Sequence, residues 1–239
     1  MSQSGREVGE IRQHSGWLIL PGLVLVVLAL CLIVLLYDLR PGTGLFRNSP
    51  TADASTVSLS VRGVRFRMPG NYLDSRATRR GGDLDVITFS AILPDMRGYS
   101  AADAGVFLNN AADSPVIHLI LRGDTDTLSA ADRLARIYMP YVDDPKGTPA
   151  PFGLIRYGFR TGTGYERNDL YAGISGGGLL LLLLCERPAQ NLPSPNCLAI
   201  DRPVAQGVSL SYRFKSAQLS RWRDIAAGVD KLVAGFLKR

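Results

Sequence analysis

Two cysteines in the second half of the chain are the first residues whose type and spacing indicate chemistry. Cys185 and Cys197 lie at the ends of the segment CERPAQNLPSPNC, whose middle is rich in proline and asparagine. A segment of this composition can turn back on itself and bring the two thiols together, so we predict a disulfide between them. Disulfides persist in oxidising compartments, and the bond would therefore place this part of the chain outside the cytoplasm. The alternative is a pair of buried free thiols in a cytosolic domain.

Few other residues have the types and spacing that enzyme chemistry requires. His118 is the one histidine after residue 56, and a lone histidine in a strand is more often packed or hydrogen-bonded than catalytic, because a catalyst needs oriented partners. The remaining carboxylate candidates are Asp95, Glu166, Asp169, Glu186 and Asp201. Acid–base catalysis would need two of them in one cleft. We predict no catalytic residues, and we keep a carboxylate-based envelope hydrolase around Glu166 or Asp169 as an alternative.

The glycine-rich segments and the cysteine spacing do not match known cofactor or metal motifs. Gly162 and Gly164 form a G-x-G pair, but Arg167 stands where the third glycine of a dinucleotide-binding turn belongs. The segment SGGG at 175–178 lacks the Gly-Lys-Ser/Thr of a phosphate-binding loop. The spacing of the two cysteines is also much longer than the C-x2–4-C of structural zinc sites. We therefore predict no cofactor and no metal, and we interpret the glycines as hairpin turns.

A group of arginines gives the clearest charge signal. The chain carries 27 basic and 21 acidic residues, for a net charge of +6. The grouped residues are Arg62, Arg65, Arg67, Arg76, Arg79 and Arg80. Such a patch can contact anionic lipid headgroups, at about 1 kcal/mol per basic residue near the surface, which makes a lipid-surface binder a second alternative. The simpler interpretation is a solvated face of a strand and a loop. We expect no nucleic-acid partner, because no aromatic–basic motif such as RNP1 occurs.

An apolar segment near the N-terminus predicts where these residues are held. Residues 17–37 contain no charge and are bracketed by Trp17 and Tyr37, aromatic residues that favour membrane interfaces. A helix of this length spans about 30 Å, the thickness of a bilayer's hydrocarbon core. The run is longer than the core of a signal peptide, so we predict an uncleaved, single-pass transmembrane helix in the lipid bilayer. The predicted parts are a cytoplasmic tail (1–16), the helix (17–37), a tether (38–56) and a periplasmic domain (57–239).

Alternation of apolar and polar residues predicts a sheet in the 57–239 domain. Period-two patterns occur at 57–61, 64–68, 87–93, 116–121, 155–159 and 208–214. Six consecutive leucines at 179–184 predict a central strand covered on both faces. From Ser216 onward, apolar residues recur every three or four positions, which predicts a long C-terminal helix. Together these patterns predict an α+β domain, with helices packed on one face of a mainly antiparallel sheet.

Several short motifs resemble a known group of proteins. They are MPGNY at 68–72, PDMRGY at 94–99, GYE at 164–166, the cysteine pair, and YRF at 212–214 before a tryptophan-bearing helix. Together they resemble uncharacterised membrane-anchored proteins of alphaproteobacteria, over most of residues 57–239. The resemblance implies a location at the bacterial inner membrane and adds no activity or site.

The combined prediction is a non-enzymatic, single-pass inner-membrane protein whose periplasmic domain binds or scaffolds envelope proteins. It could do so as an accessory subunit of a membrane complex. The apolar segment, the cysteine pair and the lack of a catalytic constellation motivate this prediction.

Overall fold

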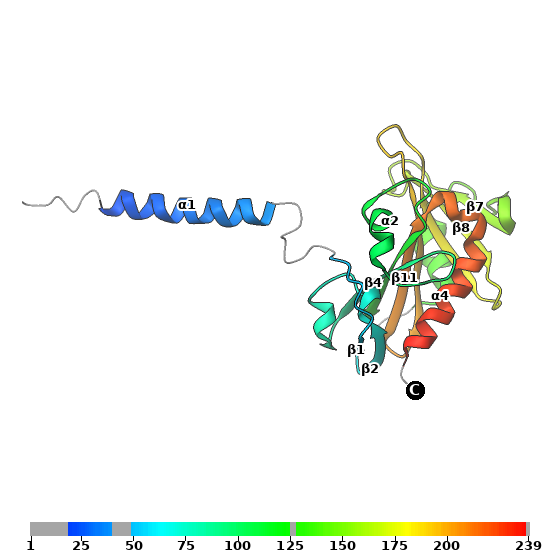
Figure 1. Cartoon of the computed structure of the whole chain (residues 1–239). Helices are drawn as coiled ribbons and strands as arrows, with labels where there is room; N and C mark the ends of the chain where they lie inside the picture. Colours follow the sequence, from blue (N-terminus) through cyan, green and yellow to red (C-terminus); the bar gives the residue numbers. More distant parts are fainter. Residues whose placement is uncertain (1–18, 40–48, 125–127, 238–239) are drawn as a thin grey trace, which may run out of the picture. The chain divides into compact units, whose positions relative to one another are not determined.

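The computed structural model describes residues 19–39, 49–124 and 128–237. The chain divides into two compact units, residues 1–47 and residues 48–239. The described part of the first unit is one helix, α1 (Ile19–Leu39), drawn in blue in Figure 1. The predicted tail lies outside the described residues, as does part of the predicted tether.

The prediction of a transmembrane helix at residues 17–37 is wrong. Within the part of the chain that the structure describes, no helix has both the length and the apolarity needed to cross a membrane. Trp17, the expected interfacial residue at one end, is not among the described residues. The predicted single-pass arrangement and the contact with the bilayer through this helix therefore lose their basis.

The second unit is built on a large antiparallel sheet. Its eight strands lie in the order β4-β5-β11-β10-β9-β8-β7-β6, and every neighbouring pair is antiparallel. The strands are β4 (Val86–Ile92), β5 (Val116–Gly123), β6 (Thr148–Ala150), β7 (Leu154–Gly158), β8 (Asn168–Ile174), β9 (Leu180–Glu186), β10 (Asn196–Ala205) and β11 (Val208–Lys215). Strands β6 to β11 follow one another as a meander, and the β4–β5 pair extends it beyond β11. The prediction of a mainly antiparallel sheet is confirmed.

A smaller sheet precedes the large one in the chain. It consists of β1 (Thr56–Val61), β2 (Val64–Pro69) and β3 (Gly82–Asp83), in the order β2-β1-β3. The phase of the apolar pattern changes between β1 and β2 because Arg62 and Gly63 form a two-residue turn, both with positive φ. Positive φ at both central residues matches the right-handed twist of the paired strands.

The helices of the second unit are short, except for the last one. They are α2 (Ala104–Leu108), α3 (Ala130–Arg133), which continues as a π-helical turn (Leu134–Tyr138), and α4 (Trp222–Phe236). The chain enters α4 through 3-10 turns at Ser216–Arg221, so the predicted C-terminal helix is confirmed but its α-helical part begins at Trp222. Single 3-10 turns lie at Gly70–Tyr72, Thr78–Arg80, Ala101–Asp103, Met139–Tyr141 and Pro151–Gly153.

The leucine-rich strand β9 is covered on both faces, as predicted. Leu181 and Leu183 belong to the main hydrophobic core, which also contains the buried face of α4. Leu182, whose side chain points to the other face, belongs to a second core with Tyr138 of the π-helical turn. Helices therefore pack on both faces of the large sheet and not on one, because a strand with no polar face must bury both of its sides.

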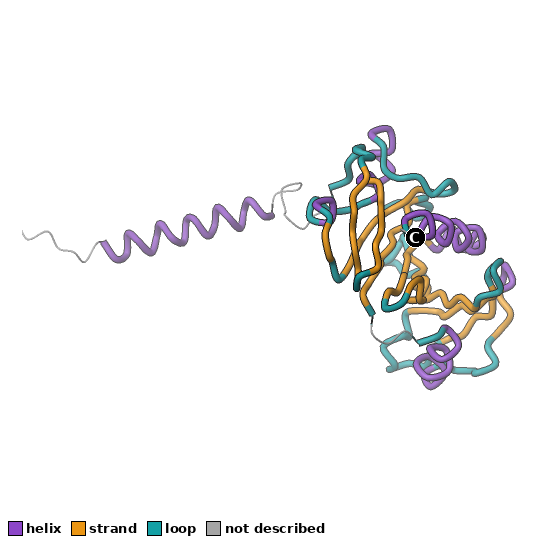
Figure 2. Tube along the Cα trace, turned by 90° about the horizontal axis from the view of Figure 1, so that it is seen from below, coloured by secondary structure: helices purple, strands orange, loops and turns teal. Residues whose placement is uncertain are grey.

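The large sheet has a narrow seam between β9 and β10. These strands pair only at Cys185–Cys197, Leu184–Leu198 and Leu183–Ala199, after which β10 bulges and continues to pair with β11 alone. Helix α4 packs across both halves of the sheet. At its start Trp222 contacts Gly173 of β8, and at its end Phe236 packs edge-on against Phe89 of β4. In Figure 2 the helix that ends near the C-terminus lies alongside the strands.

Candidate functional site

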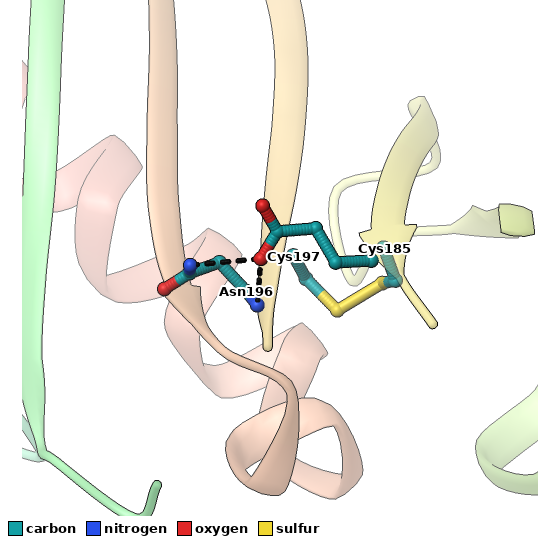
Figure 3. The surroundings of a disulfide bond; sticks show 4 residues. Cys185, Asn196 and Cys197 are labelled. Atoms are coloured by element: carbon teal, nitrogen blue, oxygen red, sulfur yellow. Dashed lines mark hydrogen bonds between the residues drawn. A yellow bond between two sulfur atoms is a disulfide. The ribbon is translucent and has the colours of Figure 1, made fainter. Parts of the chain in front are cut away.

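Cys185 and Cys197 form a disulfide across the seam (Figure 3), as predicted. The two cysteines are directly opposite each other in β9 and β10, and both are buried in the main core. Beside the bond, a carboxylate oxygen of Glu186 accepts hydrogen bonds from the backbone N–H of Asn196, at 2.7 Å, and from its side-chain amide, at 2.9 Å. The disulfide and this carboxylate together close the base of the loop between the strands. Cys31, in the first unit, is a free and exposed thiol.

Two of the five carboxylates that could have supported hydrolysis have structural partners. Asp169 accepts a 2.7 Å hydrogen bond from the guanidinium of Arg187, while Glu186 holds Asn196. Asp169 pairs in register with Cys185, the neighbour of Glu186, so these two carboxylates point to opposite faces of the sheet. Asp169 and Glu186 therefore do not converge on one substrate. Glu166, the other residue of the hydrolase alternative, lies in the turn before β8, and one of its carboxylate oxygens is buried without a hydrogen-bond partner among the described residues. Among the described side chains, no group of three or more His, Cys, Asp or Glu residues is arranged to hold a metal ion.

The six arginines of the predicted patch lie on three segments. Arg62 lies in the turn before β2, Arg65 and Arg67 lie on β2, and Arg76, Arg79 and Arg80 lie in the following loop. The guanidinium of Arg79 donates to the backbone carbonyls of Leu73, at 2.6 Å, and Ser49, at 2.8 Å. Arg79 therefore has a structural role in holding the start of the second unit, while Arg65 and Arg67 share the solvent-facing side of β2.

His118 is the end of a hydrogen-bonded chain of three side chains that sequence reasoning did not connect. The hydroxyl of Ser90 donates to a carboxylate oxygen of Asp74 at 2.6 Å, and the hydroxyl oxygen of Ser90 lies 2.9 Å from Nδ1 of His118. In a hydrolytic triad the serine is accessible and donates to the imidazole. Here the serine lies between the other two groups and is only 1% exposed. The arrangement therefore positions His118 and provides no nucleophile.

The pKa values of this chain are shifted by burial. Burial raises the pKa of Asp74 to about 6, and the hydrogen bond from Ser90 and the charge of Arg79 only partly oppose this. Partial burial of the imidazole lowers the pKa of His118, and the positive charges of Arg213 and Lys215 lower it further. At neutral pH the imidazole is therefore neutral and the carboxylate is ionised.

A cluster of exposed apolar side chains lies at one end of strands β7, β8 and β9. Four large apolar residues there have between 42% and 59% of their surface exposed: Phe152, Ile155, Ile174 and Leu179. Phe152 precedes β7, Ile174 ends β8, and Leu179 precedes β9, so these residues lie at the same end of three neighbouring strands. Ile155 pairs with Ala172 and therefore points, with Ile174, to the face of the second core. We call these four residues, with the exposed Arg223, the Phe152 surface. Sequence reasoning missed this surface because an exposed phenylalanine has no periodic signature.

Phe152 is held in a conformation that phenylalanine rarely adopts. Its φ of 65° and ψ of 22° lie in the left-handed region, which costs a residue with a side chain about 1–2 kcal/mol. Two donors from the start of α4 hold its carbonyl: the indole N–H of Trp222 at 3.1 Å and the guanidinium of Arg223 at 2.8 Å. Arg223 also donates to the carbonyl of Ile174 at 3.4 Å and lies 4.5 Å from the centre of the Trp222 ring. One clamp therefore fixes the Phe152 and Ile174 backbones.

Comparison with known proteins shows the fold. No protein-family profile matches the sequence, and no curated protein matches it. The chain is similar in structure to Smlt3025, an immunity protein of the Stenotrophomonas maltophilia type IV secretion system, with a TM-score of 0.55 and 15% identity over 78% of this chain and 94% of that one. The Neisseria meningitidis iron-regulated outer membrane lipoprotein FrpD gives a TM-score of 0.39 and 14% identity, over 82% of this chain and 98% of that one. At such identities the first similarity shows a common fold alone, and the second is too low for any argument.

Proposed function

We propose that residues 48–239 form a non-enzymatic, protein-binding domain of the bacterial envelope and that the Phe152 surface is where its protein partner docks. The observation that carries the proposal is the clamped backbone of Phe152. Phe152 is half exposed, so packing of its side chain does not impose the left-handed conformation. The conformation persists because Trp222 and Arg223 both donate to the Phe152 carbonyl. Unfavourable backbone conformations of this kind cluster at functional sites, where they fix a side chain in advance.

The composition of the Phe152 surface fits a protein partner. Binding energy at protein interfaces is concentrated in a few residues, among which aromatic residues and arginine are enriched. Phe152 supplies an aromatic side chain on a fixed backbone, and Ile155, Ile174 and Leu179 supply exposed apolar area at the same end of the strands. The guanidinium of Arg223 uses part of its five N–H donors on the two carbonyls, which leaves others for a carboxylate of the partner. We therefore expect a partner surface with an apolar pocket bordered by an acidic residue.

The disulfide and the fold support a role in the envelope. Disulfides are rare in cytosolic proteins, so the bond between Cys185 and Cys197 favours the periplasm or cell surface. The motifs that resemble alphaproteobacterial membrane-associated proteins agree with this compartment. Smlt3025, which is similar in fold to this unit, is an immunity protein of a secretion system. A secreted protein is therefore the first class of partner to test.

A substitution at Phe152 tests the proposal directly. The full chain, with an affinity tag, is expressed in an alphaproteobacterial envelope as wild type, as Phe152→Gly and as Leu108→Ala. Leu108 is the matched control, because it is an apolar residue that is 82% exposed on α2. We expect wild type and Leu108→Ala to retain the same envelope or secreted protein, and Phe152→Gly to bind it about 30-fold more weakly, the loss for a residue worth about 2 kcal/mol. Equal retention by Phe152→Gly would refute the docking surface.

A further inference from the structure

Three polar residues form a row across strands β4, β5 and β11, at the β4 edge of the large sheet. Ser90 of β4, His118 of β5 and Arg213 of β11 are paired in register, so their side chains lie on one face. Their neighbours in sequence, such as Leu119 and Tyr212, are buried in the main core. This polar row therefore lies on the face opposite to α4, where His118 and Arg213 both keep solvent-accessible surface although the imidazole is partly enclosed.

The hydrogen bonds to Ser90 determine which imidazole nitrogen faces outward. A hydroxyl has one proton, and Ser90 uses it in the 2.6 Å bond to Asp74. The serine oxygen can then only accept at the 2.9 Å contact, so Nδ1 of His118 carries a proton. In the neutral ring Nε2 is therefore the acceptor, and it becomes a donor only when the ring gains a second proton. The chain from Asp74 thus fixes both the tautomer and the orientation of the ring.

The charged groups around His118 are mainly positive. Arg213 is its partner on β11, Lys215 follows two residues later on the same face, and Arg122 lies further along β5. Lys215 is buried and held by the side-chain oxygen of Asn110 at 2.5 Å. The carboxylate of Asp74 carries negative charge, but Ser90 lies between it and the imidazole. Among residues 49–124 and 128–237, no carboxylate lies within ion-pair distance of Arg213.

We propose that His118 and Arg213 form a binding site for an anionic group, a phosphate or a carboxylate, and that the anion binds together with a proton on His118. Arg213 provides a permanent charge and a planar pair of donors that matches either anion. Protonation of His118 converts Nε2 into a second donor, and an anion at the site favours this charged form. A cation does not fit, because the positive groups beside the ring repel it. The site lies apart from the Phe152 surface and its test is independent of the protein partner.

The two histidines of the chain make the test direct. His14 is the only other histidine and serves as an internal reference in a proton NMR titration of the full chain. The pKa of His118 is measured in chloride, in inorganic phosphate and in N-acetylglutamate at one constant ionic strength, because salt alone also screens Arg213 and Lys215. We expect phosphate, N-acetylglutamate or both to raise the pKa of His118, saturably, by about half a unit or more, and to leave His14 unchanged. The two anions distinguish the phosphate source from the carboxylate source.

Two variants separate a specific site from general attraction of anions. In Arg213→Gln the pKa of His118 in chloride should rise, because a repelling charge is gone, and the added anions should have no further effect. Arg65→Gln removes an exposed charge from β2, on another part of the surface, and should respond to anions as wild type does. An unchanged pKa of His118 in both anions, or an equal anion response in Arg213→Gln, would overturn the proposal. In that case Arg213 lowers the pKa of His118 by charge repulsion and does not bind an anion.

Discussion

Reduction of the Cys185–Cys197 disulfide should destabilise the second unit by about 3 kcal/mol, the entropic contribution of a loop with a sequence separation of 12. The reductant supplies two electrons and two protons, the S–S bond breaks and two thiols form. No heavy atom is removed, so cavity effects do not enter. Strands β9 and β10 pair at only three positions along the seam, and the disulfide occupies one of these positions. A free energy of this size corresponds to an increase of about 150-fold in the unfolding equilibrium constant.

Urea unfolding of oxidised and reduced protein measures this difference. Trp222 is a suitable probe, because it is buried against Gly173 in the folded state. With a urea slope of about 2 kcal/mol per M, the midpoint should fall by about 1.5 M on reduction. As a control, reductant should not shift the midpoint of the Cys185→Ser/Cys197→Ser variant. Coincident curves for oxidised and reduced wild type would refute the reasoning that the bond stabilises this unit.

Three further predictions concern single residues. Phe152→Gly removes the left-handed cost, so it should leave the free energy of unfolding unchanged or raise it by up to about 1 kcal/mol, measured with urea, even though it weakens binding. Burial raises the pKa of Asp74 from 3.8 to about 6, so the stability that its protonated form contributes is complete below pH 3.8 and is lost as the pH rises through 6. The free energy of unfolding of Asp74→Asn, relative to that of wild type, should therefore increase by up to about 3 kcal/mol between pH 4 and pH 7.5, measured with urea. Gly173→Val should cost about 1–3 kcal/mol by the same method, because even a Cβ would lie 2.8 Å from the Trp222 ring.

Each of these predictions has a clear contrary result. A large loss of stability in Phe152→Gly would mean that the phenylalanine packs structurally and is not displayed. An equal difference between Asp74→Asn and wild type at the two pH values would mean that this carboxyl does not titrate as described. A Gly173→Val variant as stable as wild type would mean that the contact between β8 and α4 is not tight.

The parts of the fold that local patterns predict are those with a regular alternation. Strand β11 alternates strictly between apolar and polar residues, and β9 is apolar from Leu180 to Cys185, so both follow from the sequence. Strand β10 does not, because its bulges and Pro203 interrupt any period-two pattern. The helix predicted to cross the membrane rested on apolar composition over residues 17–37, and the described residues do not meet that requirement.

A candidate site could be predicted from the sequence only where its residues lie close together in the chain. Cys185 and Cys197 flank a turn-rich loop, so their pairing could be inferred. The clamp on Phe152 depends on Trp222, 70 residues away, and no sequence pattern joins the two. Similarly, Asp74 and Ser90 meet His118 only because the segment between β2 and β3 lies beside β4. Such contacts between distant segments are set by tertiary packing, not by spacing.

Site-specific photo-cross-linking in living cells tests the central claim most directly. A photoreactive phenylalanine analogue replaces Phe152 in one strain and Leu108 in another, and each cross-linked product is identified by mass spectrometry. We expect one secreted or envelope protein to be cross-linked through position 152, through an apolar contact surface with an acidic border, and position 108 not to capture it. Identical products from both positions, or no product from position 152 under conditions where the partner is produced, would contradict the claim that the Phe152 surface binds a protein.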